Sequence, residues 1–277
     1  RKPDGDLQVD VWDAPKKTVW NKIPIVRGVV NMVVSLMDGY KCLMKSAEIS
    51  TQGLEEEEPS RFEKWLDEKL GDKMTKVVSV ISAVLGFGVA ILLFAFLPAF
   101  LGGLLKGVLP RWGLSLFEGL LKIALFIGYL ALVSLMPDMK RMFQYHGAEH
   151  KTIFCYEAGL ELTVENVRKQ RRFHPRCGTS FLIIALVLSI LVFSVVTWSS
   201  PLIRTLLKLA LTPLVVGIAY ELIKLAGRYD NLFTRIISFP GLQLQHLTTR
   251  EPDDSMIEAA IASMKPVVPE TKGEDQW

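Results

Sequence analysis

Four long apolar blocks dominate the hydrophobic pattern of this 277-residue chain. From Val77 to Leu105 no residue is charged, and a helix of about 20 apolar residues is long enough to cross a bilayer. Because the connections inside the first and second pairs of blocks are short, we expect each pair to form an antiparallel hairpin. The blocks predict transmembrane helices at 77–101, 113–136, 179–199 and 202–223.

Outside these blocks, apolar residues recur at helical spacing. At 25–47 a wide face of valine, leucine and methionine lies opposite a narrow polar stripe that includes Arg27 and Asn31. Such a helix lies in the membrane interface or packs on a bundle. An acidic run at 55–58 predicts a solvated linker, and a second short apolar stripe around Trp65 follows it.

The C-terminal region predicts one more helix. Glu251-Pro252-Asp253-Asp254 places proline and acidic residues where the first turn of a helix favours them. The apolar face of this helix should dock on another element, and 265–277 should be a disordered tail. At the other end of the chain, Lys2–Asp6 predicts a turn between short strands. The residues of the docking face are Met256, Ile257, Ala260, Ile261 and Met264.

The expected fold class is all-α: a polytopic membrane protein with about four transmembrane helices in two hairpins, plus interfacial or cytoplasmic amphipathic helices. The pattern divides the chain into six segments. They are a polar N-terminal segment (1–24), amphipathic helices with an acidic linker (25–76), the first hairpin (77–136), a loop carrying histidine and cysteine (137–178), the second hairpin (179–226), and a cytoplasmic C-terminal helix and tail (227–277).

Three ionisable residues interrupt the spans. Glu118 and Lys122 are one turn apart in the second block, and Lys208 lies early in the fourth. An ionisable group within a span is a candidate functional residue. All three lie near one end of their span, so an i,i+4 pair and extension of the long side chains to the interface explain them more simply.

Charge and cysteine content narrow the class of protein. The net charge of +3 is small for a basic nucleic-acid-binding protein, and three cysteines argue against a disulfide framework and for a reducing compartment. Lys and Arg are concentrated in the 137–178 loop, which predicts that this loop and both termini are cytoplasmic. Because the chain begins at Arg1, we expect the natural amino terminus to lie upstream.

The chemistry-bearing residues gather in that loop. Two histidines four residues apart share one face of a helix, and a second pair follows at short spacing. Imidazole and thiolate groups suit zinc, although ligand type alone does not fix the metal. We therefore predict a zinc site in the loop. Its expected ligands are His146 and His150 from His-Gly-Ala-Glu-His, and His174 and Cys177 from His-Pro-Arg-Cys.

Ligand number decides what such a site can do. Four protein ligands make a closed structural site, whereas three leave a position for water. Glu149 completes the H-x-x-E-H order of inverted zinc peptidases, in which the glutamate is the general base. Without a metal, His146 and His150 would make hydrogen bonds in a helix, while His174 and Cys177 would pack at the membrane edge. A distant carboxylate could also complete the site, and the candidates are Glu157, Glu161, Glu165 and Glu221.

Several stretches of the chain resemble the bacterial membrane-protein family DUF1385. They are Tyr145–Thr152, Leu162–Val167, Phe173–Phe181, Tyr220–Arg228 and Leu247–Asp254. The similarity covers nearly the whole chain. The resemblance implies a multi-pass protein of the bacterial plasma membrane and a metal-dependent enzyme, without naming a reaction.

Two functions from different classes follow. The first is a metal-dependent hydrolase that acts at the membrane surface, with Glu149 as its base. The second is a zinc-stabilised scaffold for a membrane complex or membrane-bound ribosomes. A transporter is less favoured, because charges deep in the spans are absent. The expected partners are the lipid bilayer, anionic headgroups or a membrane complex that binds the basic segment 168–176, and further copies of the chain.

Overall fold

The computed structural model describes residues 2–13, 15–16, 18–51, 74–195 and 201–269. These residues form helices and no strand, which confirms the all-α prediction. Lys2–Asp6 is a turn, closed by a hydrogen bond of 3.0 Å from the Gly5 N–H to the Lys2 carbonyl, and its described flanks are not strands. The acidic linker, the stripe around Trp65 and residues 270–277 lie outside the described residues.

Three helices are long and apolar enough to cross a membrane, over Val80–Leu104, Trp112–Val133 and Leu206–Arg228. The first runs through α3 (Met74–Ile91), a π-helical stretch (Leu92–Phe96) and α4 (Leu97–Leu104); the others are α5 (Arg111–Val133) and α9 (Pro201–Arg228). The third predicted span is the shorter helix α8 (Gly178–Ser194), and residues 196–199 of that prediction are outside the described part. The chain is thus an all-α polytopic protein.

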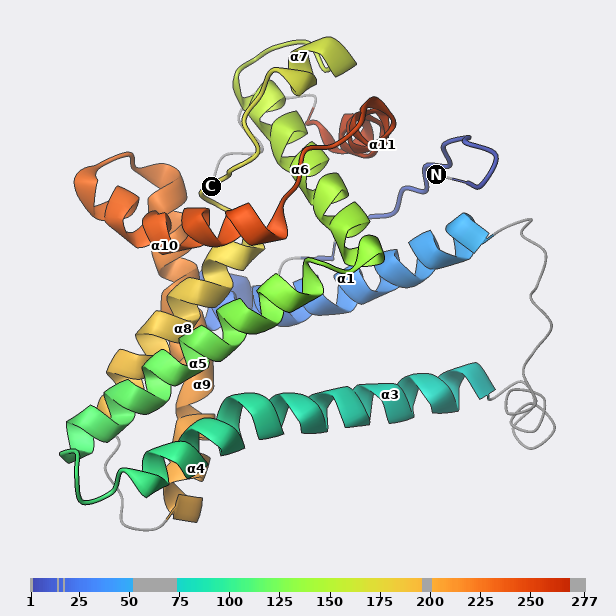
Figure 1. Ribbon diagram of the computed structural model, residues 1–277. Helices are drawn as coiled ribbons and strands as arrows, with labels where there is room; N and C mark the ends of the chain where they lie inside the picture. Colours follow the sequence, from blue (N-terminus) through green and yellow to red (C-terminus); the bar gives the residue numbers. More distant parts are fainter. Residues whose placement is uncertain (1, 14, 17, 52–73, 196–200, 270–277) are drawn as a thin grey trace.

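The 137–178 loop is itself mostly helical. It forms α6 (Pro137–Glu157) and α7 (Val164–Arg168), which pack with α11 (Asp254–Met264) into a lobe above the long apolar helices (Figure 1). Here the term lobe means α6, α7 and α11. Met256, Ile257 and Ile261 of α11 form one buried cluster with residues of α6 and α7, so the docking predicted for this helix is confirmed. The partners in that cluster are Ala148, Cys155 and Val167.

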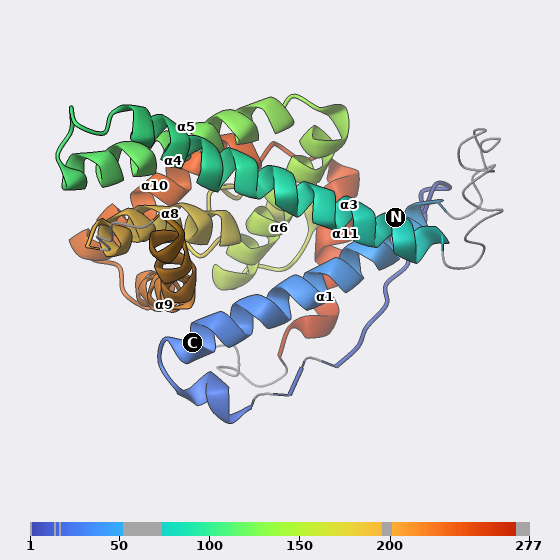
Figure 2. The ribbon, with the colours of Figure 1, turned by 90° about the horizontal axis from the view of Figure 1, so that it is seen from below.

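The predicted N-terminal amphipathic helix is α1 (Val26–Thr51), preceded by a short 3-10 turn at Val19–Lys22. Its first turns pack against α9, and the rest of the helix extends past the bundle (Figure 2). Arg27 forms an ion pair with Glu221 of α9, and Asn31 donates a hydrogen bond of 2.8 Å to the Tyr220 hydroxyl. The polar stripe of α1 therefore serves as a docking face for α9.

One further helix was not expected from the sequence. Helix α10 (Leu232–Thr248) follows α9 after three residues and packs across α8. Pro240 lies inside it, and Gly241 lets it approach closely, because a Cβ there would be 2.4 Å from the Cβ of Ser180. A proline–glycine pair ordinarily predicts a break, which is why the pattern did not predict this helix.

The buried Glu118 pairs across helices. Its carboxylate lies 3.3 Å from the Lys208 ammonium of α9, so an i,i+4 pair within α5 does not fully explain these charges. Gly102 of α4 packs directly on the Glu118 side chain, with a Cβ position 3.0 Å from its Cγ. The ion pair thus joins α5 and α9 where α4 covers it.

Candidate metal centre

Three of the four predicted ligands come together. His146 and His150 lie one turn apart on α6, and Cys177 precedes the first residue of α8 as its N-cap. One ligand atom from each of the three lies within 4.8 Å of the other two, and Nε2 of His146 is 3.1 Å from the Cys177 sulfur. His150 and Cys177 are buried and His146 is partly buried. The cluster is therefore compact enough to surround one metal ion.

Main-chain carbonyls fix both imidazoles of the cluster. Nδ1 of His146 lies 2.7 Å from the carbonyl of Thr248, and Nδ1 of His150 lies 2.5 Å from the carbonyl of Arg172. A carbonyl can only accept, so each Nδ1 carries a proton, and Nε2 is the nitrogen of each ring that is left to face a metal ion. Metal-binding histidines show this arrangement, in which the second ring nitrogen donates to an outer group.

The glycine of the His-Gly-Ala-Glu-His motif has a specific steric role. A Cβ at Gly147 would lie 2.1 Å from the carbonyl oxygen of Arg250, which is far inside contact distance. The N–H of Arg250 also donates a bond of 2.8 Å to the carbonyl of Phe143 on α6. Gly147 therefore allows the segment that follows α10 to lie on α6, where Thr248 reaches His146.

The surroundings of Cys177 favour its thiolate form. Its sulfur accepts from the Thr179 N–H at 3.4 Å and lies 3.2 Å from the Thr179 hydroxyl. Burial acts to raise the pKa of the Cys177 thiol, but hydrogen bonds from His146 and His150 outweigh burial and lower that pKa to about 5. The thiolate is the form of cysteine that binds metals, and a metal ion would displace the imidazole protons that the sulfur accepts, so metal binding would release protons.

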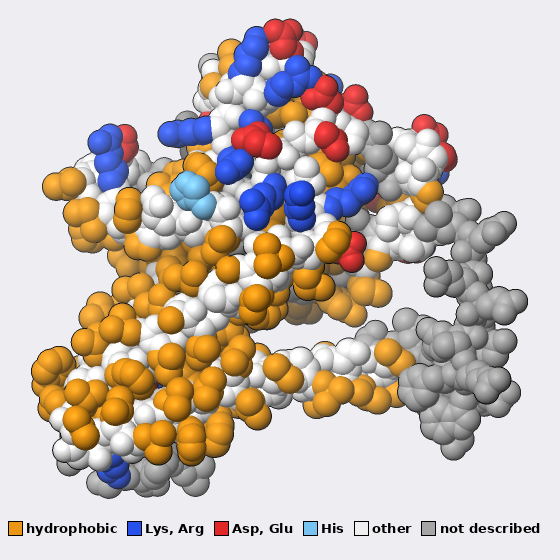
Figure 3. Space-filling view, viewed as in Figure 1, with side chains coloured by type: hydrophobic (Ala, Val, Ile, Leu, Met, Phe, Trp, Pro, Cys, Tyr) orange, Lys and Arg blue, Asp and Glu red, His pale blue; other side chains and the backbone are white. Residues whose placement is uncertain are grey.

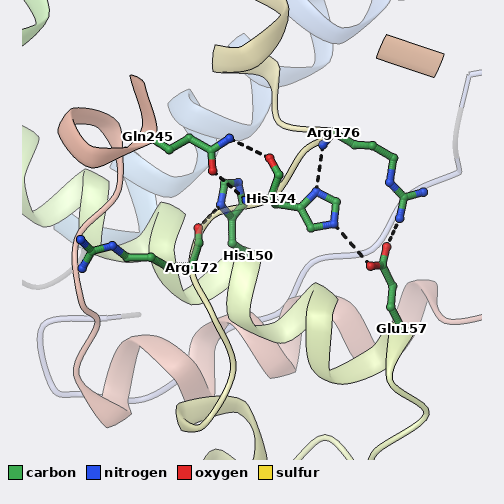
Figure 4. Close-up of polar contacts among 6 residues, drawn as sticks. All are labelled: His150, Glu157, Arg172, His174, Arg176 and Gln245. Carbon is green, nitrogen blue, oxygen red and sulfur yellow. Dashed lines mark hydrogen bonds and ion pairs between the residues drawn. The ribbon is translucent and has the colours of Figure 1, made fainter. Parts of the chain in front are cut away.

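The fourth predicted ligand, His174, lies beside the cluster and faces other groups (Figure 4). Its Nδ1 accepts from the Arg176 N–H at 3.2 Å, and its Nε2 faces Glu157 at 3.5 Å, while Arg176 also pairs with Glu157. Burial, followed by the charge of His150, lowers the pKa of His174 to about 4, so the ring is neutral at pH 7. Both ring nitrogens of His174 are thus directed at protein groups.

No carboxylate of the described residues joins the cluster. Glu149 is exposed on α6 next to His150, and its negative charge acts to raise the pKa of His146. Glu157 pairs with Arg176, Glu165 with Lys169 at 2.7 Å, and Glu221 with Arg27. Glu161 is exposed, and its main-chain carbonyl accepts from Asn166. The candidates for a carboxylate ligand therefore have other surroundings in this structure.

Gln245 is a supporting residue that sequence reasoning missed. This fully buried side chain of α10 accepts from the His174 N–H and donates to the His174 carbonyl, each at 2.7 Å (Figure 4). It also donates to the Ser180 hydroxyl at 3.0 Å. These hydrogen bonds hold the segment that leads into Cys177 against α10. No motif marks Gln245, so nothing in the sequence signalled its role.

Comparison with known proteins places the chain in a family. Residues 23–270 match the family described as "Protein of unknown function (DUF1385)". The chain belongs to the DUF1385 family. It is 36% identical over 251 residues to the "Uncharacterized protein YqhQ" of Bacillus subtilis (strain 168), which covers 90% of this chain and 78% of that protein. No solved structure matches the chain. The match to DUF1385 includes α6, α8 and α10, and hence the whole candidate metal centre.

Proposed function

We propose that this DUF1385 protein binds one zinc ion through His146, His150 and Cys177 and leaves the fourth coordination position for water. The observation that carries this proposal is that one ring nitrogen each of His146 and His150 and the Cys177 sulfur lie within 4.8 Å of one another. A set of two imidazoles and one thiolate suits zinc, and three protein ligands with one open position are typical of catalytic zinc.

With an open coordination position, the activity that we propose is that of a metal-dependent hydrolase at the membrane surface. Bound zinc would supply Lewis acidity and a water of lowered pKa. Glu149 is exposed beside the ligand His150 and close enough for its charge to act on His146. We assign Glu149 the role of general base, which takes the proton from the attacking water.

The second candidate is a closed structural site in a scaffold protein. The observation in its favour is the position of the His174 ring, whose centroid is 5.7 Å from that of His150. A change of the His174 rotamer, away from Glu157, would supply a fourth ligand and complete a tetrahedron. In that case zinc would pin the segment before α8 onto α6, and the basic segment 168–176 would be the surface for anionic headgroups or a membrane complex.

The proposed location is the bacterial plasma membrane, with the candidate metal centre and both termini in the cytoplasm. Charged side chains gather over the lobe, whereas hydrophobic side chains cover the spans below it (Figure 3). Lys and Arg in the loop between the second and third apolar blocks support this orientation through the positive-inside rule.

Metal analysis and X-ray absorption on the purified full chain test the proposal. We expect one zinc per chain with two nitrogen ligands, one sulfur and one exchangeable oxygen. Cys177→Ser should remove the sulfur signal, while Glu149→Gln should keep the metal, because Glu149 is not a ligand. Three nitrogens and a sulfur without oxygen would favour the scaffold. Absence of stoichiometric metal in wild-type protein would exclude both candidates.

A further inference from the structure

Helix α10 has its polar and apolar faces reversed relative to a helix on a water-soluble protein. Helices in water bury their apolar face and expose their polar one. The buried face of α10 instead carries small or polar residues, including Thr234, Ser238, Gly241 and Gln245. In its first half the outer face is apolar, with Leu232, Phe233, Ile236 and Phe239 exposed by 75%, 56%, 62% and 59%. Exposed apolar side chains of this size and number indicate that an apolar partner covers this face of the helix.

The position of α10 indicates which apolar partner covers its outer face. The candidate span in α9 ends at Arg228, and only three residues separate it from Leu232. The four Cα–Cα steps from Arg228 to Leu232 reach at most about 13–14 Å, so α10 begins close to the end of a membrane span. The hydrophobic surface over α10 continues into that of the spans beneath it (Figure 3). The outer face of α10 is thus part of the same apolar surface.

The residues at the edges of this face are those found at membrane–water interfaces. The Arg228 guanidinium lies over the ring of Tyr229, 5.8 Å from its centroid, immediately before α10. Arg235 is exposed and paired with Asp230 at 2.7 Å. Tyrosine and arginine are favoured at headgroup depth, where one end of the side chain is apolar and the other is hydrated.

We propose that the first half of α10 lies in the membrane–water interface, with Leu232, Phe233, Ile236 and Phe239 in contact with lipid acyl chains. The second half carries the exposed polar residues Gln243 and His246, so it rises out of the acyl region. The same second half supplies the Thr248 carbonyl to His146 and the Gln245 amide to His174. The lipid-bound helix therefore holds the candidate metal centre at the surface of the bilayer.

Spin-label accessibility tests this arrangement in the full chain, reconstituted into liposomes of phosphatidylcholine and phosphatidylglycerol. Labels would be attached at Ile236→Cys and Phe239→Cys, with Gln243→Cys as the matched control on the same exposed side. The background carries Cys42→Ser, because Cys42 is exposed, whereas Cys155 and Cys177 are buried. The same background without an added cysteine measures labelling of those two. Because the substituted side chains are exposed, we expect the fold to be retained, which circular dichroism would check.

Oxygen partitions into acyl chains, and the neutral nickel chelate NiEDDA stays in water. We expect the ratio of oxygen to nickel collision rates to be several-fold higher at positions 236 and 239 than at 243. High nickel accessibility at 236 and 239 would place this face in water and overturn the proposal. Low collision rates with both reagents at these two positions would indicate a protein partner or a second copy, and would overturn it equally. None of these outcomes depends on metal binding.

Discussion

Helices α11 and α3 are both apolar, yet they are stabilised in opposite ways. Ile257 of α11 is 1% exposed and packs on residues of α6 and α7, whereas Phe87 of α3 is 70% exposed. In the most apolar window of the first span, no residue is buried, and α3 extends away from the bundle (Figure 1). The lobe therefore folds as a water-soluble domain does, while α3 relies on an apolar solvent.

The contrast has a consequence for the candidate metal centre. Its candidate ligands lie on α6 and at the start of α8, and their supporting carbonyls come from segments packed on the lobe. Interior packing tolerates little change of volume, so substitutions in the lobe should disturb the geometry of the candidate metal centre. Substitutions on the open face of α3 should not.

The largest effect should come from the lobe core. Ile257→Ala removes buried volume next to Ala148 and Cys155, and we expect it to lower the free energy of unfolding by about 2–5 kcal/mol. Val84→Ala on α3 is the control, because Val84 is 65% exposed and leaves no cavity. Denaturant titration in lipid bicelles would measure both. Equal losses for the two variants would mean that α3 is packed in the membrane as tightly as α11.

A methyl group at Gly147 should have the next largest effect. Gly147→Ala places a Cβ against the Arg250 carbonyl, and overpacking of this kind costs about 1–3 kcal/mol. Displacement of the segment around Arg250 would also move Thr248 away from His146, so we expect the amount of bound metal to fall. Gly86→Ala on α3 is the matched control, because no atom lies within 4 Å of its Cβ position. Full metal content in Gly147→Ala protein would contradict the close approach.

The smallest effect concerns the cap of α11. Asp253 accepts a hydrogen bond of 2.9 Å from the Met256 N–H, and Asp253→Ala should cost about 1 kcal/mol. The hydrogen bond from Ser255 holds the pKa of Asp253 below its usual 3.8. Its contribution is therefore complete above about pH 4 and is lost as pH falls through the lower, folded-state pKa.

Asp253→Asn separates the hydrogen-bonding role of this N-cap side chain from its negative charge. Asparagine keeps the acceptor for the Met256 N–H but does not titrate, so the variant should retain most of the stability at pH 7. Denaturant titrations of both proteins between pH 3 and 7 would compare them. A wild-type protein that loses no more stability than Asp253→Asn in acid would rule out a contribution from this carboxylate.

Sequence reasoning succeeded where a single pattern determines the structure. The spans were predictable because a long, strongly apolar stretch has few alternatives, and the pairing of His146 with His150 follows from helical spacing. Helix α10 was not predictable, because its apolar residues face outward and Pro240 with Gly241 suggests a break. The carbonyl partners of the histidines were not predictable either, because every residue has a main-chain carbonyl and no sequence pattern marks the one that accepts. The orientation of His174 depends on Glu157 and Gln245, which no spacing connects to it.

The use of carbonyl groups to orient His146 and His150 has an evolutionary consequence. Every residue type carries a carbonyl, so the side chains of Arg172 and Thr248 can be replaced without removing the acceptors that select the ring tautomers. Sequence drift at these two positions therefore leaves the orientation of the two imidazoles unchanged. Only changes that displace the backbone itself, such as an insertion before His174 or after Thr248, would release the imidazoles.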